Sequence, residues 1–404
     1  MGYAERKEQS LQGNVPNLRF PEFSGEWEHV ALSEIAARVT RKNKDNASKL
    51  PLTISAQYGL VDQISFFNKV VASADMSNYY LLRQGEFAYN KSYSSDYPWG
   101  AIKRLDGYPQ GALSSLYICF AVNDKVDSDF AVHYFESSKW HREVSNIAGE
   151  GARNHGLLNI AVGDFFDTKH RLPSSKEEQK KIAALLNLIT ERIATQIKII
   201  EDLKKLKSAI THLHFDAAID KYYSAYIGDC IEQVSQRNKD GKVKEVLSVS
   251  NKNGFVNQSE QFEDREIASE DTSNYKVVHT NDFAYNPARI NVGSVARLHN
   301  YACGIVSPMY ICFHTKPMLL PEYFEHIFST SYFRHEMHKR LEGSVRLCLT
   351  YDSLCNIKIA LPSIDEQKQF VSQISAIISK IINEDRLLTL YQTLKRYLLS
   401  QVFI

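Results

Sequence analysis

Two segments of the sequence carry side chains suited to contacts with a nucleic acid. Residues 91–104 read Lys-Ser-Tyr-Ser-Ser-Asp-Tyr-Pro-Trp-Gly-Ala-Ile-Lys-Arg and mix cations, hydroxyls and aromatic rings. Residues 287–297 read Pro-Ala-Arg-Ile-Asn-Val-Gly-Ser-Val-Ala-Arg and occupy the matching place in the second half of the chain. Cations and hydroxyls bind phosphate oxygens, whereas Arg and Asn also pair with base edges. The composition of both segments is that of loops suited to phosphate contacts and base-edge hydrogen bonds.

Two further basic segments recur in both halves. Arg41-Lys-Asn-Lys44 matches Arg237-Asn-Lys239, and Glu150-Gly-Ala-Arg153 matches Glu342-Gly-Ser-Val-Arg346. One such segment is a weak signal because solvated basic loops are common, but three at equivalent positions in two halves are more specific. The predicted DNA-binding residues are Arg41, Lys42, Lys44, Lys91, Tyr93, Ser94, Tyr97, Trp99, Arg104, Arg153, Asn154, His155, Arg237, Lys239, Arg289, Asn291, Arg297 and Arg346.

Roles follow from side-chain chemistry. The arginines that we expect to bind guanine in bidentate fashion, or phosphates, are Arg153, Arg289, Arg297 and Arg346. Asn154 and Asn291 could pair with adenine. Tyr93, Tyr97 and Trp99 could pack on sugars or on distorted bases.

Motifs for catalysis are missing from the sequence. It contains no Gly-x-x-x-x-Gly-Lys-Ser/Thr phosphate loop and no Gly-x-Gly-x-x-Gly cofactor turn. Tyr285-Asn-Pro-Ala288 departs from the Asn-Pro-Pro-aromatic motif of adenine methyltransferases, and we interpret Phe-Ala-Tyr-Asn as a strand end. The histidines His133, His141, His212 and His214 lack a metal-ligand pattern. We therefore expect a non-enzymatic chain without a cofactor or metal of its own.

Composition is that of an ordinary globular protein. The 404 residues are 44% hydrophobic and 24% charged, with a formal net charge of +1. This near-neutral charge argues weakly against a free-standing nucleic-acid binder, so local charge or a basic partner would have to supply the phosphate affinity. Six cysteines without a Cys-x-x-Cys pair favour reduced core thiols. No signal peptide or membrane-spanning stretch is visible, and we expect a cytoplasmic protein.

The chain repeats itself with an offset of 188 to 197 residues. Gly85-Glu-Phe-Ala-Tyr-Asn90 recurs as Asn281-Asp-Phe-Ala-Tyr-Asn286, and Leu116-Tyr-Ile-Cys-Phe120 recurs as Met309-Tyr-Ile-Cys-Phe313. Leu172-Pro-Ser174 recurs as Leu361-Pro-Ser363, each followed by Glu-Gln-Lys. A unit of this size is too large for a solenoid repeat and indicates two copies of one domain.

A long helix follows each copy. Ser174-Ser-Lys-Glu177 and Ser363-Ile-Asp-Glu366 predict capping boxes, with Ser174 and Ser363 as the capping residues. Apolar residues then recur every three or four positions from Ile182 to Leu213 and from Phe370 to Val402, including Ile193, Ile197, Leu206, Ile381 and Leu394. Such stripes favour coiled-coil pairing, with the other copy as the simplest partner.

Each repeated domain has mixed character. In the first copy we expect strands at Leu52–Ala56, Gly85–Tyr89 and Ser114–Val122; in the second, at Leu247–Ser250, Asp282–Tyr285 and Ile305–His314. Helical spacing of aromatic residues predicts one helix at about 129–147 and one at about 321–341. The fold class is α+β: two tandem domains separated by two long helices that form an antiparallel coiled coil with pseudo-two-fold symmetry.

The sequence resembles the specificity subunits of type I restriction-modification systems. The similarity rests on the opening Leu18-Arg-Phe-Pro-Glu-Phe-Ser-Gly-Glu-Trp27 and on the two Leu-Pro-Ser…Glu-Gln-Lys helix starts, and it covers essentially the whole chain. It implies two target-recognition domains that read the halves of a bipartite, asymmetric double-stranded DNA site. It also implies two modification subunits that bring S-adenosylmethionine, and restriction subunits that bring ATP- and Mg-dependent translocase and nuclease activity.

We therefore expect five parts: an N-terminal segment (1–27), target-recognition domain 1 (28–172), a central conserved helix (173–216), target-recognition domain 2 (217–361) and a distal conserved helix (362–404). Recognition domains diverge with the DNA that they read, so base contacts do not carry over by position. The rival interpretations are a coiled-coil scaffold with two protein-binding domains, and a detached specificity part of a larger restriction enzyme.

Overall fold

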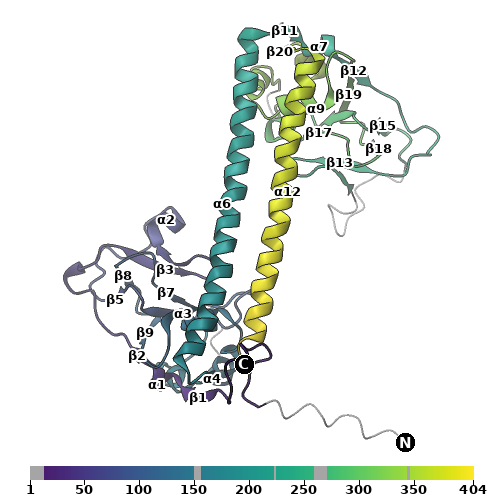
Figure 1. Cartoon of the computed structure of the whole chain (residues 1–404). Coiled ribbons are helices and arrows are strands. Elements are labelled where there is room, and N and C mark those ends of the chain that lie inside the picture. The colour runs from purple at the N-terminus through teal and green to yellow at the C-terminus, as the bar shows by residue number, and fades with distance from the viewer. Residues whose placement is uncertain (1–12, 150–155, 223, 259–270, 344–345) are drawn as a thin grey trace, which may run out of the picture. The chain divides into compact units, whose positions relative to one another are not determined.

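The structure, a computed structural model, describes residues 13–149, 156–222, 224–258, 271–343 and 346–404. By contacts the chain divides into two compact units (Figure 1). The first unit comprises Met1–Ile197 and Leu387–Ile404, and the second comprises Lys198–Arg386. Each unit therefore contains a globular part, one end of the first long helix and the opposite end of the second.

The described part of the first unit contains two four-stranded sheets. One is antiparallel with the order β2 (Ala36–Arg38), β9 (Ile118–Val122), β6 (Phe87–Asn90) and β7 (Ala101–Arg104). The other has the order β4 (Gly59–Asp62), β3 (Pro51–Ser55), β8 (Gln110–Leu113) and β5 (Tyr80–Arg83), with β3 and β8 parallel. A separate pair joins β1 (Glu28–Ala31) to β10 (Lys169–Leu172). Large apolar side chains of both sheets are buried, which forms the cores of the globular part.

The described part of the second unit repeats the antiparallel sheet. Its order is β12 (Ile231–Val234), β19 (Ile311–Thr315), β16 (Phe283–Tyr285) and β17 (Val295–Arg297). Three strand pairs accompany it: β13 (Leu247–Ser250) with β14 (Gly254–Asn257), β15 (Lys276–His279) with β18 (Cys303–Val306), and β11 (Ser224–Tyr226) with β20 (Lys358–Ala360).

Register confirms that the two units are copies. Phe87 stands opposite Phe120 in the first unit, and their rings stack with centroids 5.4 Å apart. Phe283 stands opposite Phe313 in the second unit, with the rings stacked at 5.2 Å. The predicted strands at the two Phe-Ala-Tyr segments are therefore present, in the same place of each sheet.

Two of the predicted strands are wrong in extent. The segment Ser114–Val122 becomes a strand only at Ile118, because Tyr117 N bonds back to Ser114 O and closes a turn. The segment Ile305–His314 is split between β18 and β19, because Tyr310 N bonds to Ser307 O in the turn between them. Turn hydrogen bonds interrupted runs that looked continuously apolar.

Short helices cover the antiparallel sheets. In the first unit these are α3 (Ser128–Glu136), α4 (His141–Ile147) and α5 (Val162–Asp167), and in the second they are α9 (Pro321–Ile327), α10 (Ser331–His338) and α11 (Tyr351–Cys355). The single helices predicted at about 129–147 and 321–341 are thus wrong, since each is broken in two. Ser137 Oγ bonds to Tyr134 O and ends α3, and Thr330 caps α10 by accepting from Phe333 N.

Three other short α-helices are α1 (Leu32–Ile35), α2 (Gln63–Phe67) and α7 (Ile227–Cys230). The backbone N–H of Ala31 donates to the Glu34 carboxylate, and that of Tyr226 donates to the Asp229 carboxylate. The acidic residue three positions on thus starts α1 and α7 in the same way, one in each unit.

The two long helices are α6 (Lys176–Lys221) and α12 (Ile364–Gln401). The capping box predicted at Ser363 is confirmed, because Ser363 Oγ accepts from Glu366 N and Ser363 N donates to the Glu366 carboxylate. The prediction for the first helix is wrong by one residue. Ser175, not Ser174, accepts from Glu178 N, because the first copy has one more residue between its Leu-Pro-Ser and its Glu-Gln-Lys.

Within each unit the long helices run antiparallel, as predicted (Figure 1). In the first unit Ile182 and Leu186, near the start of α6, share a core with Leu398 and Val402 at the other end of the second long helix. In the second unit Phe215, near the end of α6, lies in one core with Phe370 near the start of α12, with ring centroids 5.3 Å apart. Each long helix thus begins in one core and ends in the other.

The apolar stripes are only partly buried. Ile197, Leu206, Leu213 and Leu394 are exposed, contrary to the predicted seam. A straight helix of 3.6 residues per turn drifts away from a seven-residue repeat, so regularly spaced residues leave the contact line. The polar residues Gln196 and Glu384 are buried at equivalent positions instead.

Candidate nucleic-acid interface

In the first unit the β6–β7 loop is joined to the loop that precedes α5. Tyr93 N donates to Gly156 O over 3.0 Å, and Leu158 N donates to Lys91 O over 2.9 Å. Lys91 Nζ lies 3.4 Å from Ile160 O. These bonds place the start of the predicted DNA-binding loop beside the segment that begins at residue 156.

The fold of the β6–β7 loop separates its aromatic rings. Ser94 and Tyr97 exchange backbone hydrogen bonds and close a turn. Gly100 has φ +76°, and a Cβ there would collide with the Asn90 carbonyl, so the loop requires glycine at its end. Tyr97 and Trp99 are half-buried against the cores of the unit, whereas Tyr93 is 43% exposed. The loop thus presents Tyr93 and Ser94 to solvent.

The second unit has an equivalent pair of loops. After β16 the chain makes a single 3-10 turn, Ile290–Val292, which Arg289 immediately precedes. Ile290 is buried, whereas Arg289 and Asn291 are exposed. Gly293, at φ +92°, reverses the chain into β17. Leu349 N donates to Pro287 O over 3.0 Å, which joins this turn to the loop that carries Arg346.

Arg346 is exposed in a loop closed by two backbone bonds between Glu342 and Cys348, of 2.9 and 2.8 Å. The structure therefore brings three predicted residues of the second unit, Arg289, Asn291 and Arg346, onto two adjoining loops. Their predicted counterparts in the first unit, Arg153, Asn154 and His155, lie outside the described residues.

A buried asparagine shapes the other basic segment in each unit. Asn43 bonds to both the N–H and the C=O of Ser48, and Asn238 bonds in the same way to Val243. The neighbouring residues Lys42 and Arg237 donate to equivalent carbonyls, those of Asn78 and Asn274. The structural equivalence is thus Lys42-Asn-Lys44 with Arg237-Asn-Lys239.

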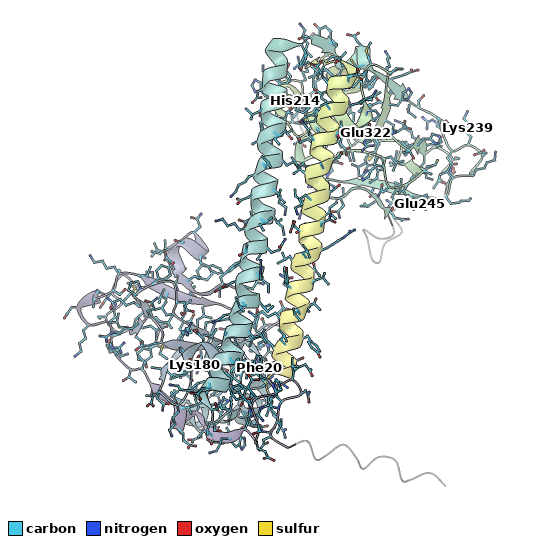
Figure 2. The ribbon with its side chains drawn as sticks, viewed as in Figure 1. Phe20, Lys180, His214, Lys239, Glu245 and Glu322 are labelled. Atoms are coloured by element: carbon cyan, nitrogen blue, oxygen red, sulfur yellow. The ribbon has the colours of Figure 1, made fainter. Side chains whose placement is uncertain are left out.

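Lys44 and Lys239 follow these asparagines and are exposed. Figure 2 shows Lys239 at the edge of the second unit away from α12. Lys42 has its ammonium 4.5 Å from the centre of the Tyr80 ring. Lys44 and Lys239 are therefore held on fixed turns with their charges in solvent, a placement suited to phosphate contacts.

Arg104 and Arg297 occupy equivalent positions opposite Phe87 and Phe283, and both are held by carboxylates. Arg104 lies 2.7 Å from Asp129 and 2.6 Å from Asp106. Arg297 lies 3.2 Å from Glu322 and 3.0 Å from Glu325. Hydrogen bonds from Arg104 and from Asn187 hold the pKa of Asp129 below its usual range. Both guanidinium groups thus tie a strand to a helix within their unit.

Arg41 is also engaged inside the first unit. Its guanidinium pairs with Glu86 at 2.9 Å and donates to Leu81 O at 3.0 Å. Glu86 in turn accepts from Arg83 N, so the arginine braces the turn between β5 and β6. A phosphate at Arg41 would have to compete with this carboxylate.

An exposed aromatic cluster escaped the sequence-based prediction. Tyr58, Phe66 and Phe67 are 72%, 44% and 44% exposed, and the Phe66 and Phe67 rings meet edge to face at 5.0 Å. They lie on the β3–β4 turn and on α2, which Asp62 caps by accepting from Ile64 N. The signal was two adjacent aromatic residues, Phe66 and Phe67, four and five positions after the capping aspartate Asp62.

Metal-binding chemistry is not evident in the described residues, where no group of three or more His, Cys, Asp or Glu side chains could hold an ion. All six cysteines are free, and burial raises the pKa of the Cys119 and Cys312 thiols to about 12. No helix in the described part of the chain is long and apolar enough to cross a membrane.

Comparisons with known proteins give the fold. No protein-family model matches the chain, and no curated protein matches it. The type I restriction-modification system S subunit from M. genitalium matches at TM-score 0.55 and 15% identity, covering 96% of this chain and 99% of that one. A chain from a study of complex assembly and conformational transition of the type I R-M system matches at TM-score 0.56 and 15% identity, covering 93% and 97%. The chain therefore has the fold of these S subunits along nearly its whole length.

Proposed function

We propose that this chain is the DNA sequence-recognition subunit of a type I restriction-modification complex. The observation that carries the proposal is the duplicated pair of adjoining loops, one pair in each unit. In the second unit these loops present Arg289, Asn291 and Arg346 to solvent. The shared fold with S subunits of such systems supports the same conclusion.

Each unit would read one half of a bipartite site. In the first unit Tyr93 and Ser94 face outward beside the segment from Gly156, and in the second Arg289 and Asn291 face outward. Guanine accepts two hydrogen bonds from one arginine, and adenine pairs with one asparagine, so the second loop pair suits direct readout. The two loops differ in length and composition, and the two half-sites should therefore differ.

The chain would not itself catalyse. Modification subunits would bring S-adenosylmethionine, and restriction subunits would bring ATP- and Mg-dependent activity, as the resemblance implies. Residues 28–172 and 217–361 would form the two target-recognition domains, and 173–216 and 362–404 the conserved helices that bind partners. The near-neutral net charge of +1 fits a subunit whose partners supply much of the phosphate affinity.

The test is co-expression with the cognate modification subunit, followed by sequencing of methylated bases in the host DNA. The expected result is one split, asymmetric motif. Replacing 222–360 with the equivalent domain of a relative should change one half of that motif and preserve the other. A purified chain that methylates or cleaves DNA unaided, or a swap that alters both halves, would contradict the proposal.

Arg289→Ala sharpens this test within the second unit. Loss of a bidentate base contact should cost roughly 1–3 kcal/mol of binding and relax one position of the second half-site. The matched control is Arg297→Ala, because Arg297 is held by Glu322 and Glu325. An equal change of specificity in both variants would remove the distinction drawn between them.

A further inference from the structure

Each unit has a cleft along the long helix whose C-terminal part lies in that unit. The globular part forms the other wall of the first cleft, whereas the second long helix, with Ser329 of the globular part, forms that of the second. In the first unit α12 supplies Gln392, Lys395, Arg396 and Leu399 to one wall, and Ile193 of α6 also lines the cleft. In the second unit α6 supplies Lys204, Lys207, Ser208, Thr211 and His212, and Ile381 of α12 lines it. Different helices thus build the same kind of cleft.

The two clefts are equivalent in the repeat. Lys395 follows Lys207 by 188 residues, and Ile381 follows Ile193 by the same interval. That interval also separates Gln179 from its counterpart at the start of α12, Gln367. Lys207 and Lys395 therefore occupy equivalent positions in the two copies of the repeat.

Cations outnumber carboxylates in the first cleft. Its charged or titratable lining residues are Asp96, Lys103, Glu136, His141, Lys395 and Arg396. Lys395 Nζ lies 2.8 Å from Glu136, and the Lys395 side chain is 15% exposed. Burial alone would raise the pKa of Glu136, but His133, Lys395 and Lys103 hold it at about 2. The Glu136 carboxylate thus interacts with two lysine ammonium groups, those of Lys395 and Lys103.

The second cleft has, among its described lining residues, no carboxylate that offsets the charge of its lysines. Ser329 stands where the first unit has Glu136, and Ala296 stands where it has Lys103. Lys204 and Lys207 line the cleft, and none of its lining residues in the described part of the chain is a carboxylate. Both clefts therefore keep positive charge beside apolar walls, where an anion would be held more strongly than in open water.

We propose that the two clefts bind phosphate groups of the DNA backbone next to the half-sites. This inference rests on the proposed function and adds a contact to it. Lysine and arginine form strong charge-assisted bonds with phosphate oxygens. The first cleft is also lined by Asp96 and Tyr97 of the β6–β7 loop. A phosphate held there would belong to the duplex whose bases face that loop.

The first test measures how DNA affinity depends on salt in the complex of the full chain with its modification subunits. Lys207→Ala and the double variant Lys395→Ala, Arg396→Ala are compared with Lys205→Ala. Lys205 is 75% exposed, pairs with Asp202 on the same helix, and is not a lining residue. Each lost phosphate contact should lower the slope of log K against log salt by about 0.9, with binding roughly 3- to 10-fold weaker at 0.1 M salt.

The methylated motif should be unchanged in all these variants, because phosphates carry no base identity. Slopes equal to that of Lys205→Ala would overturn the inference, and so would loss of the modification subunit with an unaltered slope. The proposed function would survive either result. If the parent complex itself shows no preference for its methylated motif, it is the proposed function that fails.

The second test predicts a change in the opposite direction. Glu136→Gln keeps the shape of the side chain but releases Lys395 from its carboxylate. The variant should bind DNA several-fold more tightly, with a steeper salt slope. A tie that served only to hold α3 against the long helix would instead lower the melting temperature and leave the slope unchanged. Unchanged or weaker DNA binding by a folded Glu136→Gln complex would overturn the inference.

Discussion

The two units fasten their long helices with the same glutamine but surround it differently. Gln179 is buried, accepts from Asp127 N, and donates to Lys125 O and Pro173 O. Gln367 is buried, accepts from Leu320 N, and donates to Met318 O and Pro362 O. The duplicated framework thus keeps one amide clamp between each helix start and the loop before α3 or α9.

The glutamate that precedes each glutamine makes different contacts in the two units. Glu178 is buried and binds Arg19 at 2.7 Å and Trp27 Nε1 at 3.2 Å. Glu366 is more exposed and bonds to Ser363 and to the Tyr222 hydroxyl. In the first unit the glutamate therefore anchors the segment before β1, whereas in the second it mainly caps its own helix. Glu178 and Glu366, at equivalent positions of the repeat, have different structural roles because different segments of the chain contact them.

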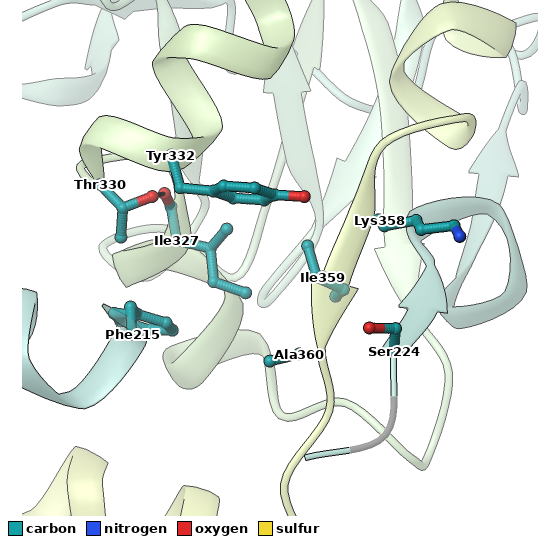
Figure 3. A pocket seen from close by; sticks show the side chains of 8 residues that line it. All are labelled: Phe215, Ser224, Ile327, Thr330, Tyr332, Lys358, Ile359 and Ala360. Atoms are coloured by element: carbon teal, nitrogen blue, oxygen red, sulfur yellow. Dashed lines mark hydrogen bonds between the residues drawn. The ribbon is translucent and has the colours of Figure 1, made fainter. Parts of the chain in front are cut away.

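The polar interior of the first unit is also without a counterpart. His170 is buried between the Tyr134 hydroxyl and Thr168 Oγ1, each 2.9 Å away. Thr168 donates to Phe165 O, so it accepts from the imidazole Nε2–H, and Tyr134 donates to Nδ1. In the second unit Ile359 stands in place of His170 and Ile327 in place of Tyr134, and both line a small pocket with Phe215 (Figure 3).

The largest effect is expected at Glu178. Glu178→Ala leaves Arg19, whose side chain is only 13% exposed, without its carboxylate, and should cost about 3–5 kcal/mol of stability in the first unit. Glu366→Ala removes a cap and one hydroxyl contact and should cost about 1 kcal/mol in the second unit. Hydrogen exchange, which resolves the two units, measures both. Equal losses would erase the difference drawn between the two glutamates.

Acid should weaken the first unit more than the second through His170. Burial, with a smaller contribution from His29, lowers the pKa of His170 to about 4. Above the unfolded pKa of about 6.5 the imidazole is neutral in both states and has no effect. As the pH falls from there to about 4, only the unfolded chain gains the proton, so up to roughly 3 kcal/mol of stability is lost.

Denaturant unfolding at pH 7 and pH 5, followed for each unit by hydrogen exchange, checks this acid effect. His170→Ile, which copies the second unit, should flatten the pH dependence of the first unit in that range. The same pH dependence in parent and variant would show that another group is responsible.

Removing the buried glutamine should lower the stability of each unit by a similar amount. Gln179→Ala and Gln367→Ala each leave a buried backbone N–H and two carbonyls without partners, and each should cost roughly 1–3 kcal/mol in its own unit. Thermal melting of both variants and of the double variant provides the measurement. A large loss in one unit and none in the other would mean that the clamp is not a shared device.

The smallest loss of stability is expected at the partly exposed ion pairs that both units share, those of Arg104 and Arg297. Arg104→Ala and Arg297→Ala each break a partly exposed tie between a strand and a helix and should cost about 1 kcal/mol. Thermal melting measures the loss, with Lys205→Ala as a surface control. A loss of several kcal/mol from either arginine variant would show that these pairs carry more of the fold than their exposure suggests.

The sequence alone determined the duplication, the α+β class and the two long helices. Repeated motifs and apolar spacing are local and periodic, and a polar–apolar pattern is enough to show them. The same patterns located the Phe-Ala-Tyr strands and the capping box at Ser363, because all the partners in that box lie within four residues.

Only the tertiary structure decided which charges are available to a ligand. Arg104 and Arg289 look alike in the sequence, but Asp129, from another element, holds the first, and the second is exposed on a turn. Likewise Arg19 reaches Glu178 across 159 positions of the chain. Long-range pairing leaves no periodic trace in a single sequence, so burial and ion pairing, and with them the function of each cation, follow from the fold.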